Sequence, residues 1–466
     1  MNSKAGTEYQ TAFPARFTDR ERPSAILLWG RERVSWYDIL AFAAPLFRFV
    51  RFQFIGFLLG TDLILWFAFP FVVISRGRLL DEALPRRFLF LGFLWLLGQV
   101  LTDIVRATPL QELTRGWSMI GATLVDFVIL YVLLSDNRRR IILYALAIAI
   151  GTYAEYFLNP YGYSLTQPWK FGVGPAIAGL IVLLAACCYA RGLRFVCAGL
   201  LLFTGLLNVF MVSRAAGLVC VLAASFVGSK SLLSQGTKRS ATHTLMLPIA
   251  ILLGAFAIAR TYACAANHGL LGANARLEYQ SQSSGSFGLL VGGRGDSLAS
   301  IRAIMDSPII GHGSWPTDST YTLYLAHLMA SLGYRNSPAS AAIKRYGGLI
   351  PAHSHLWGAW VQAGVAGAIF WFWVYSLIIR GLRALYTADE PLTPLIAYFA
   401  FLLGWDVLFS PYGFDRRFLT TYYVILLMFV LNKDANHALR LCRYHFIQSG
   451  AIPGTNDSLG ARAKLS

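Results

Sequence analysis

The sequence predicts an all-α protein that crosses a membrane many times. Of its 466 residues, 56% are hydrophobic and only 14% are charged, and the mean hydropathy is +0.54. Many of its apolar runs approach the roughly 20 residues that a helix needs to cross about 30 Å of hydrocarbon. A soluble chain of this length could not bury so many apolar runs and keep so little charge for its surface.

Apolar runs separated by charged residues predict about twelve helical spans. In chain order, the expected segments are 36–52, 55–75, 87–107, 115–134, 141–158, 171–190, 193–212, 215–233, 243–260, 354–379, 392–410 and 417–431. The first two are the least sharply defined, because Arg48 and Arg51 interrupt the apolar run and would have to lie at a membrane edge.

The formal net charge of +17 argues for a membrane topology rather than for nucleic-acid binding. The Lys and Arg residues recur in alternate short connections instead of forming one basic domain, as the positive-inside rule expects. The predicted organisation is a cytoplasmic segment 1–35, spans within 36–260, one long outer loop 261–353, further spans within 354–431 and a cytoplasmic tail 432–466. Short connections such as 159–170 then face outward with the loop.

The predicted outer loop is long enough to fold on the membrane surface. With about ninety residues rich in Gly, Ser, Tyr and charged side chains, it is too large to be a simple connector. Helical spacing of apolar residues predicts a short helix near 297–307, beginning at Asp296 or Ser297, and a second helix over 319–331. A Gly-rich turn separates the two helices, and the loop ends at His353-Ser354-His355.

Several short motifs, taken together and in order, resemble the O-antigen ligase and polymerase superfamily. They are Ser213-Arg214-Ala215-Ala216, Gly293-Arg294, Ile301-Arg302-Ala303-Ile304-Met305, Ser307-Pro308-Ile309-Ile310-Gly311-His312-Gly313, His353-Ser354, and Gln362 with Gly364 and Gly367. The likeness covers about the central third of the chain, residues 205–380. Ser354 stands where the superfamily usually has Asn, and Ala215 where it usually has Gly.

The resemblance implies a glycosyltransferase of the C type in the inner membrane of a Gram-negative bacterium. Such an enzyme moves O-antigen polysaccharide from undecaprenyl pyrophosphate to a sugar of the lipid A-core on the periplasmic face. The residue types present suit this chemistry. Arg binds diphosphate oxygens through paired hydrogen bonds and keeps its charge, and His titrates near the pH at which an acceptor hydroxyl must lose its proton.

The motif positions imply a role for individual residues. Counting back from Gly364 and Gly367 puts His353 at the superfamily histidine, so His353 is expected to be the general base, and Arg214 and Arg294 are expected to bind the donor pyrophosphate. A second group of possible substrate-binding residues comprises Arg260, Arg302, His312, Lys344, Arg345 and His355. Each residue also has a structural reading, as a helix cap, a membrane-edge cation or a solvated side chain.

No metal or other cofactor is expected. The predicted outer face has no Asp-x-Asp pair of the kind that holds a divalent ion on a sugar diphosphate. Direct attack by the acceptor hydroxyl on the anomeric carbon would then invert its configuration.

Two kinds of alternative remain open. An O-antigen polymerase or a protein O-oligosaccharyltransferase would share the donor and the base. A lipid or solute transporter is a different class, suggested by the acidic residues within predicted spans: Asp62, Asp103, Asp126, Glu155 and Asp406.

Overall fold

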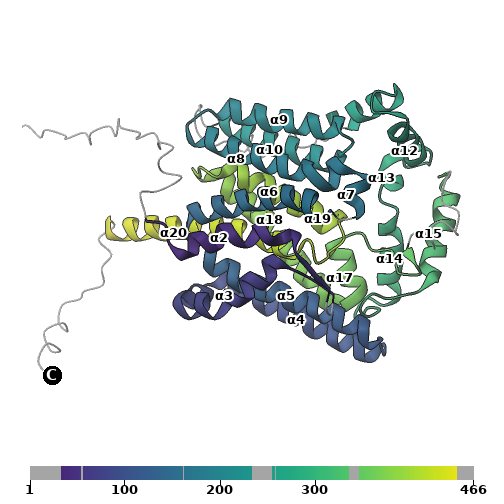
Figure 1. Ribbon diagram of the computed structural model, residues 1–466, viewed down its shortest axis with the longest axis horizontal. Coiled ribbons are helices and arrows are strands. Elements are labelled where there is room, and N and C mark those ends of the chain that lie inside the picture. The colour runs from purple at the N-terminus through teal and green to yellow at the C-terminus, as the bar shows by residue number, and fades with distance from the viewer. Residues whose placement is uncertain are drawn as a thin grey trace, which may run out of the picture.

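The computed structural model describes residues 33–53, 56–160, 162–233, 254, 256–257, 259–334 and 346–448. Figure 1 shows a bundle of long helices, with a group of shorter helices at one end. In chain order, the elements are α2 (Trp36–Leu46), η1 (Phe47–Phe49), β1 (Arg51–Gln53), β2 (Phe57–Leu59), α3 (Gly60–Arg76), η2 (Gly77–Asp81), α4 (Ala83–Val105), α5 (Leu110–Leu134), α6 (Arg138–Leu158), α7 (Gly162–Thr166), η3 (Trp169–Val173), α8 (Gly174–Ala190), α9 (Arg194–Phe210), α10 (Arg214–Leu233), α12 (Ala273–Ser283), α13 (Gly288–Gly292), α14 (Asp296–Asp306), α15 (Ser319–Ser331), α17 (His355–Ala363), α18 (Val365–Thr387), α19 (Thr393–Phe409) and α20 (Arg417–Gln448).

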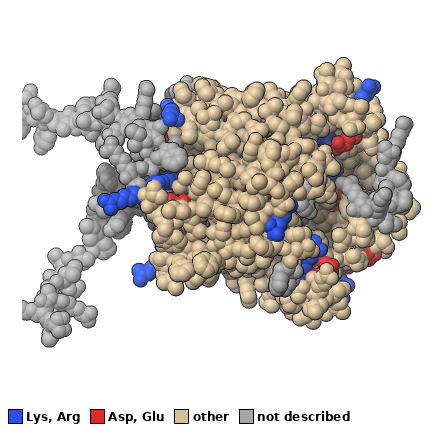
Figure 2. Space-filling model, viewed as in Figure 1, with Lys and Arg blue, Asp and Glu red and all other residues tan. Residues whose placement is uncertain are grey.

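Within the described residues, seven helices are long and apolar enough to cross a membrane. They are Gly60–Asp81, Ala83–Val105, Leu110–Leu134, Arg138–Leu158, Trp169–Ala190, Arg214–Leu232 and Val365–Thr387. The helices α9 and α19 are apolar but shorter. Figure 2 shows that charged side chains are sparse over the wide middle of the visible face and more frequent toward its two ends. This distribution suits a bundle surrounded by lipid, and the predicted class of helical membrane protein is confirmed.

Two predicted spans have the wrong boundaries. The segment 36–52 ends as an α-helix at Leu46 and continues through a 3₁₀ turn into the antiparallel hairpin β1–β2, in which Arg51 faces Leu59. The segment 354–379 is two helices, because Gly364 adopts φ +63° and ψ −151°, a conformation open almost only to glycine. The spanning helix therefore begins at Val365, and α17 is a separate nine-residue helix.

The other described spans agree with the prediction to within a few residues, except at the end of the last helix. Most of the predicted span 243–260 lies outside the described residues. The helix α20 continues to Gln448, past the boundary expected near residue 431. In the loop, the predicted helices 297–307 and 319–331 are confirmed as α14 and α15, whereas α12 and α13 were not predicted.

The short helices α12, α13, α14 and α15 lie at one end of the bundle, on the right in Figure 1, which is called the loop end below. The start of α5 lies at this end, since the Arg115 guanidinium stacks 3.6 Å from the Trp315 ring centroid. The connection between α5 and α6 therefore lies at the opposite end of the bundle.

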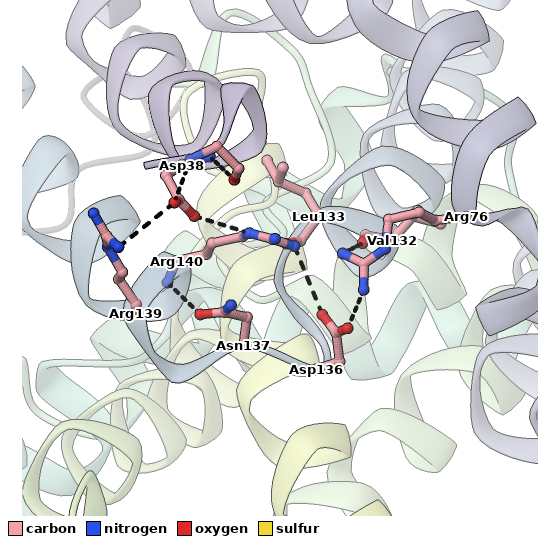
Figure 3. A network of polar contacts seen from close by, with 9 residues as sticks. Asp38, Arg76, Val132, Leu133, Asp136, Asn137, Arg139 and Arg140 are labelled. Atoms are coloured by element: carbon pink, nitrogen blue, oxygen red, sulfur yellow. Dashed lines mark hydrogen bonds and ion pairs between the residues drawn. The ribbon is translucent and has the colours of Figure 1, made fainter. Parts of the chain in front are cut away.

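Ion pairs join helices at that opposite end (Figure 3). The Arg140 guanidinium lies 3.1 Å from an Asp38 carboxylate oxygen and 3.8 Å from Asp136, and Asp136 also pairs with Arg76. Asp38 and Arg140 are buried, with exposures of 5% and 9%. Part of the basic charge that the sequence assigns to topology therefore also holds α2, α3 and the start of α6 together.

Candidate functional site

His353 lies beside a carboxylate at the loop end of the bundle. Its Nδ1 atom is 3.4 Å from Oδ2 of Asp296, the first residue of α14, and its side chain is 44% exposed. The Tyr346 hydroxyl donates to the other oxygen of Asp296, and the Tyr346 ring meets the His353 ring edge to face, with centroids 6.3 Å apart. This arrangement orients an accessible imidazole through one nitrogen, as carboxylates do for catalytic histidines.

Hydrogen bonds fix both chain segments that make this pair. The Ser300 hydroxyl of α14 donates to the carbonyl oxygen of Pro351 at 2.7 Å, which ties the helix carrying Asp296 to the segment before His353. The next residue, Ser354, accepts from the Trp357 amide at 3.0 Å as the N-cap of α17, and its hydroxyl donates to the Val407 carbonyl in α19. His353 is therefore held at a capped helix start and not on a freely moving loop.

A glycine junction joins the loop to the bundle. The His312 amide donates to the Val361 carbonyl at 2.7 Å, and the Val365 amide donates to the Ile309 carbonyl at 3.1 Å. A Cβ atom on Gly364 would lie 1.9 Å from the Ile309 carbonyl oxygen, and one on Gly311, whose φ is +79°, would lie 2.6 Å from the Gly364 amide. Two of the motifs that carry the sequence resemblance are thus in direct backbone contact.

Arg294 projects from just before α14 onto the end of α19. Its guanidinium donates to the Phe409 carbonyl at 3.1 Å and stacks 4.8 Å from the Trp405 ring centroid. Burial, and then the nearby charge of Arg214, lowers the pKa of Arg294, and the nearby Asp296 carboxylate partly opposes this shift. An arginine keeps its charge despite such a shift, so a cation is held close to the His353–Asp296 pair.

Arg214, at the start of α10, faces the loop helix α12. It donates to Glu278 at 3.0 Å and to Gln282 at 2.9 Å, and it stacks 4.7 Å from the Tyr262 ring centroid. Its side chain is 31% exposed. The Gln282 side-chain oxygen that accepts from Arg214 also lies 3.8 Å from where a Cβ on Gly293 would be, so the two predicted anion-binding residues, Arg214 and Arg294, lie near the same glutamine.

Lys170 is a third cation in this region, and the sequence analysis did not select it. It lies in η3 at the loop end of α8 and is exposed. The indole of the neighbouring Trp169 donates to Asn208 at 3.0 Å, and the Asn208 carbonyl accepts from the amide of Ser213, the residue before Arg214. A signal for it exists in the sequence, because Lys170 is the one charged residue of the connection 159–170. We call Lys170, Arg214 and Arg294 the cation cluster.

The second group of predicted site residues divides according to position. Arg302 pairs with Asp306 at 3.0 Å along α14, and His312 lies 2.8 Å from the Ala303 carbonyl oxygen, so both support the loop structure. Arg260 is exposed. Lys344 and Arg345 lie outside the described residues.

His355 is buried at the start of α17, which is outside the seven spans. Its Nδ1 atom lies 2.6 Å from the Ser410 carbonyl oxygen, and its ring meets the rings of Trp371 and Tyr412 edge to face at 4.9 Å. Burial lowers the pKa of His355 to about 4, so the imidazole stays neutral in the folded protein. His355 therefore has a packing role, whereas His353 is accessible.

Each of the five acidic residues that suggested a transporter has a partner. Asp62 pairs with Arg417, Asp406 with Arg416, and Glu155 with both Arg48 and Arg51. Asp126 accepts from the Trp66 indole at 2.8 Å. Asp103 accepts from the amide and hydroxyl of Ser314, which fixes the loop to α4.

The described residues contain no group of three or more His, Cys, Asp and Glu side chains that could hold a metal ion. In comparisons with protein families, curated proteins and solved structures, the chain has no match. The site is therefore defined by its own geometry, in a helical membrane protein: an exposed histidine paired with a carboxylate, beside three cations contributed by separate elements.

Proposed function

We propose that this protein is a membrane glycosyltransferase, an O-antigen ligase that transfers O-antigen polysaccharide from undecaprenyl pyrophosphate to the lipid A-core. The observation that carries the proposal is the His353–Asp296 pair beside the cation cluster. One face thereby offers a base for an acceptor hydroxyl and positive charge for a diphosphate, and both are at an end of a bundle that lipid surrounds.

In the proposed reaction, the acceptor hydroxyl oxygen forms a bond to the anomeric carbon of the donor sugar. The bond between that carbon and the pyrophosphate oxygen breaks, and undecaprenyl pyrophosphate leaves with the electron pair. His353 accepts the hydroxyl proton through Nε2, while Asp296, facing Nδ1, stabilises the imidazolium that forms. The cation cluster stabilises the negative charge that develops on the departing diphosphate.

The proposal includes a particular topology. About twelve spans in a bacterial inner membrane would place the loop end in the periplasm and both chain termini in the cytoplasm. The donor head group would then reach the cation cluster from the periplasmic leaflet, with its polyprenyl tail in the bilayer. The acceptor would reach His353 from the same side.

Paired carboxylates argue for an enzyme over a transporter. A transporter that couples to protons or ions uses intramembrane carboxylates that can change partners during transport. Here Asp62, Glu155 and Asp406 are each bound to arginine, which gives them a structural role. We therefore expect transfer to fail when His353 is removed.

The test uses purified protein in lipid, with an undecaprenyl-pyrophosphate-linked glycan and lipid A-core, in the presence of EDTA. Wild type should form glycan-linked lipid A-core, and the His353→Ala and Arg294→Ala variants should lose at least about 100-fold in rate, the loss typical of removing a general base or a transition-state cation. Arg302→Ala is the matched control, since it removes an arginine of the same loop whose partner is Asp306.

The products decide between the proposal and its alternatives. Growth of the lipid-linked glycan would indicate a polymerase, and glycan on a protein acceptor would indicate an oligosaccharyltransferase. Retention of configuration at the anomeric carbon would refute direct displacement. A wild-type rate that depends on added Mg²⁺ would refute the metal-independent reaction.

A further inference from the structure

The helix α14 exposes an apolar strip that its role in the site does not explain. Ala299 and Ala303, on one face of α14, are fully buried. On another face, Ile301 is 40% exposed and Met305 is 68% exposed, and Ile309 just beyond the helix is 72% exposed. Contact between large apolar side chains and water is unfavourable relative to burial, so this strip calls for an apolar cover.

The remaining face of α14 is charged. Arg302 and Asp306 form an ion pair along it, with side-chain exposures of 50% and 36%. The helix therefore has a buried face toward the protein, an apolar outward face and a charged edge. An amphipathic helix that lies in the plane of a membrane interface has this division of its outward surface.

The apolar strip is continuous with the surface of the spanning helices. The Trp360 indole donates to the Pro308 carbonyl at 2.9 Å, and the Trp360 ring contacts the Phe372 ring of α18, with centroids 5.9 Å apart. Phe372 and Ile369 are exposed side chains of the span Val365–Thr387, at 49% and 42%. Ile309 thus adjoins a surface that lipid must cover.

A second connection joins the strip to α4. Arg106 at the end of α4 donates to the Ser307 hydroxyl at 2.6 Å and to the Gly311 carbonyl at 2.9 Å. The last residues of that span, Ile104 and Val105, are 67% and 62% exposed. The segment after α14 is therefore held between the loop ends of two spans, each of which has exposed apolar residues.

We propose that α14 lies in the membrane interface, with Ile301, Met305 and Ile309 inserted among the lipid acyl chains of the leaflet nearest the loop end. The occupant of the apolar strip is thus lipid and not another protein. Trp360 occupies the depth at which tryptophan is enriched in membrane proteins, and the Arg302–Asp306 pair faces the head groups. This inference does not depend on the proposed reaction.

One consequence concerns the candidate site. Asp296 is the first residue of α14, and Arg294 immediately precedes the helix. A helix seated in the interface would fix the height of both residues above the hydrocarbon. It would hold the His353–Asp296 pair at the level where the head group of a lipid-linked substrate meets water.

Site-directed spin labelling tests the location of the strip. The Met305→Cys and Ile309→Cys variants are made separately in the full-length protein, whose six native cysteines are replaced by serine. Each is spin-labelled and reconstituted in phospholipid vesicles. Collisions with oxygen, which concentrates in hydrocarbon, are compared with collisions with a water-soluble nickel chelate. Position 369 on α18 is the lipid-facing reference, and position 324 on α15, where Tyr324 is 39% exposed, is the loop reference.

We expect the ratio of oxygen to nickel collisions at 305 and 309 to approach the ratio at 369 and to exceed the ratio at 324 several-fold. Nickel accessibility at both positions as high as at 324 would overturn the proposal. Labels at 305 and 309 that are shielded from both reagents would also overturn it, because they would show that a protein surface covers the strip. Two independent positions keep the result from depending on one variant that folds poorly.

Discussion

Replacing Asp296 by Asn should slow transfer without weakening donor binding. The substitution keeps the size of the side chain and an oxygen that can accept from Tyr346, and it removes the negative charge 3.4 Å from His353 Nδ1. Because the imidazole becomes positive as it takes the acceptor proton, the lost charge matters more in the transition state than in the ground state. The expected effect is therefore on kcat and not on KM for the donor.

The size of the effect follows from this distance. Two unit charges separated by 3.4 Å attract each other by about 1 kcal/mol at the dielectric constant of water and by about 5 kcal/mol at an effective value of 20. His353 is 44% exposed, and solvent screening places the interaction in the lower part of this range, about 1–3 kcal/mol. At 1.36 kcal/mol per tenfold change in rate, kcat should fall roughly 5- to 150-fold.

The assay measures transfer to lipid A-core by wild type, Asp296→Asn, His353→Ala and the double variant. Asp306→Asn is the control, since it neutralises another carboxylate of α14, one that contacts Arg302 and Tyr321. If Asp296 acts through His353, the double variant should be no slower than His353→Ala alone. Equal rates for Asp296→Asn and Asp306→Asn, or full additivity in the double variant, would refute the reasoning.

Three further predictions test the anion site and the fold. Lys170→Ala should raise KM for the donor about tenfold, which is the scale of one charge-assisted hydrogen bond lost at an exposed site, and Lys170→Arg should restore binding. Steady-state kinetics at two salt concentrations checks this, and an unchanged KM would contradict it. Gly364→Ala should lower the free energy of unfolding by roughly 2–6 kcal/mol, because a Cβ there strains the backbone and overlaps the Ile309 carbonyl. Gly121→Ala is the control: its Cβ would meet nothing within 4 Å, so denaturant titrations should show it to be neutral or slightly stabilising. Arg140→Ala should cost about 3 kcal/mol, because it replaces the close ion pair of the buried Asp38 with the longer 3.9 Å contact to Arg139 and leaves the Ser35 amide as the other partner of this carboxylate. A thermal melt no lower than that of the exposed control Arg302→Ala would contradict this.

The parts of the fold that the sequence predicts well are those set by local composition. Apolar runs identify α4, α5, α6 and α8 to within a few residues, because the hydrocarbon thickness demands a minimum length of apolar helix. The helices α14 and α15 were also predicted, since their apolar residues recur at helical spacing.

Two errors arose where a local pattern has more than one structural solution. The segment 36–52 is apolar enough for a span, yet the chain turns at η1 into the β1–β2 hairpin. In this arrangement Arg48 and Arg51 both pair with Glu155. The break at Gly364 was missed because an isolated glycine is common within membrane helices. Only its contact with Ile309, far away in the sequence, requires the left-handed backbone.

The candidate site shows the same division between local and tertiary information. Motif order was sufficient to select His353, Arg214 and Arg294, but nothing in the sequence places Asp296 beside His353 rather than beside Arg294. That choice depends on how α14 packs against α17 and on the hydrogen bond between Ser300 and Pro351. Lys170 joins the cluster because η3 packs on the loop end of α9, where the Trp169 indole donates to Asn208, close to the start of α10.

The positions of these groups suggest why the site lies where helices end. A diphosphate needs an excess of positive charge, and a lipid tail needs an apolar surface next to it. The loop end offers both within a short distance, because Arg294 lies between the aromatic end of α19 and the start of α14, whose outer face is apolar. Helices buried within the bundle could not supply the charge, and a loop far from the bilayer could not supply the apolar surface; within the part of the chain that the structure describes, the loop end combines the two, as the proposed reaction requires.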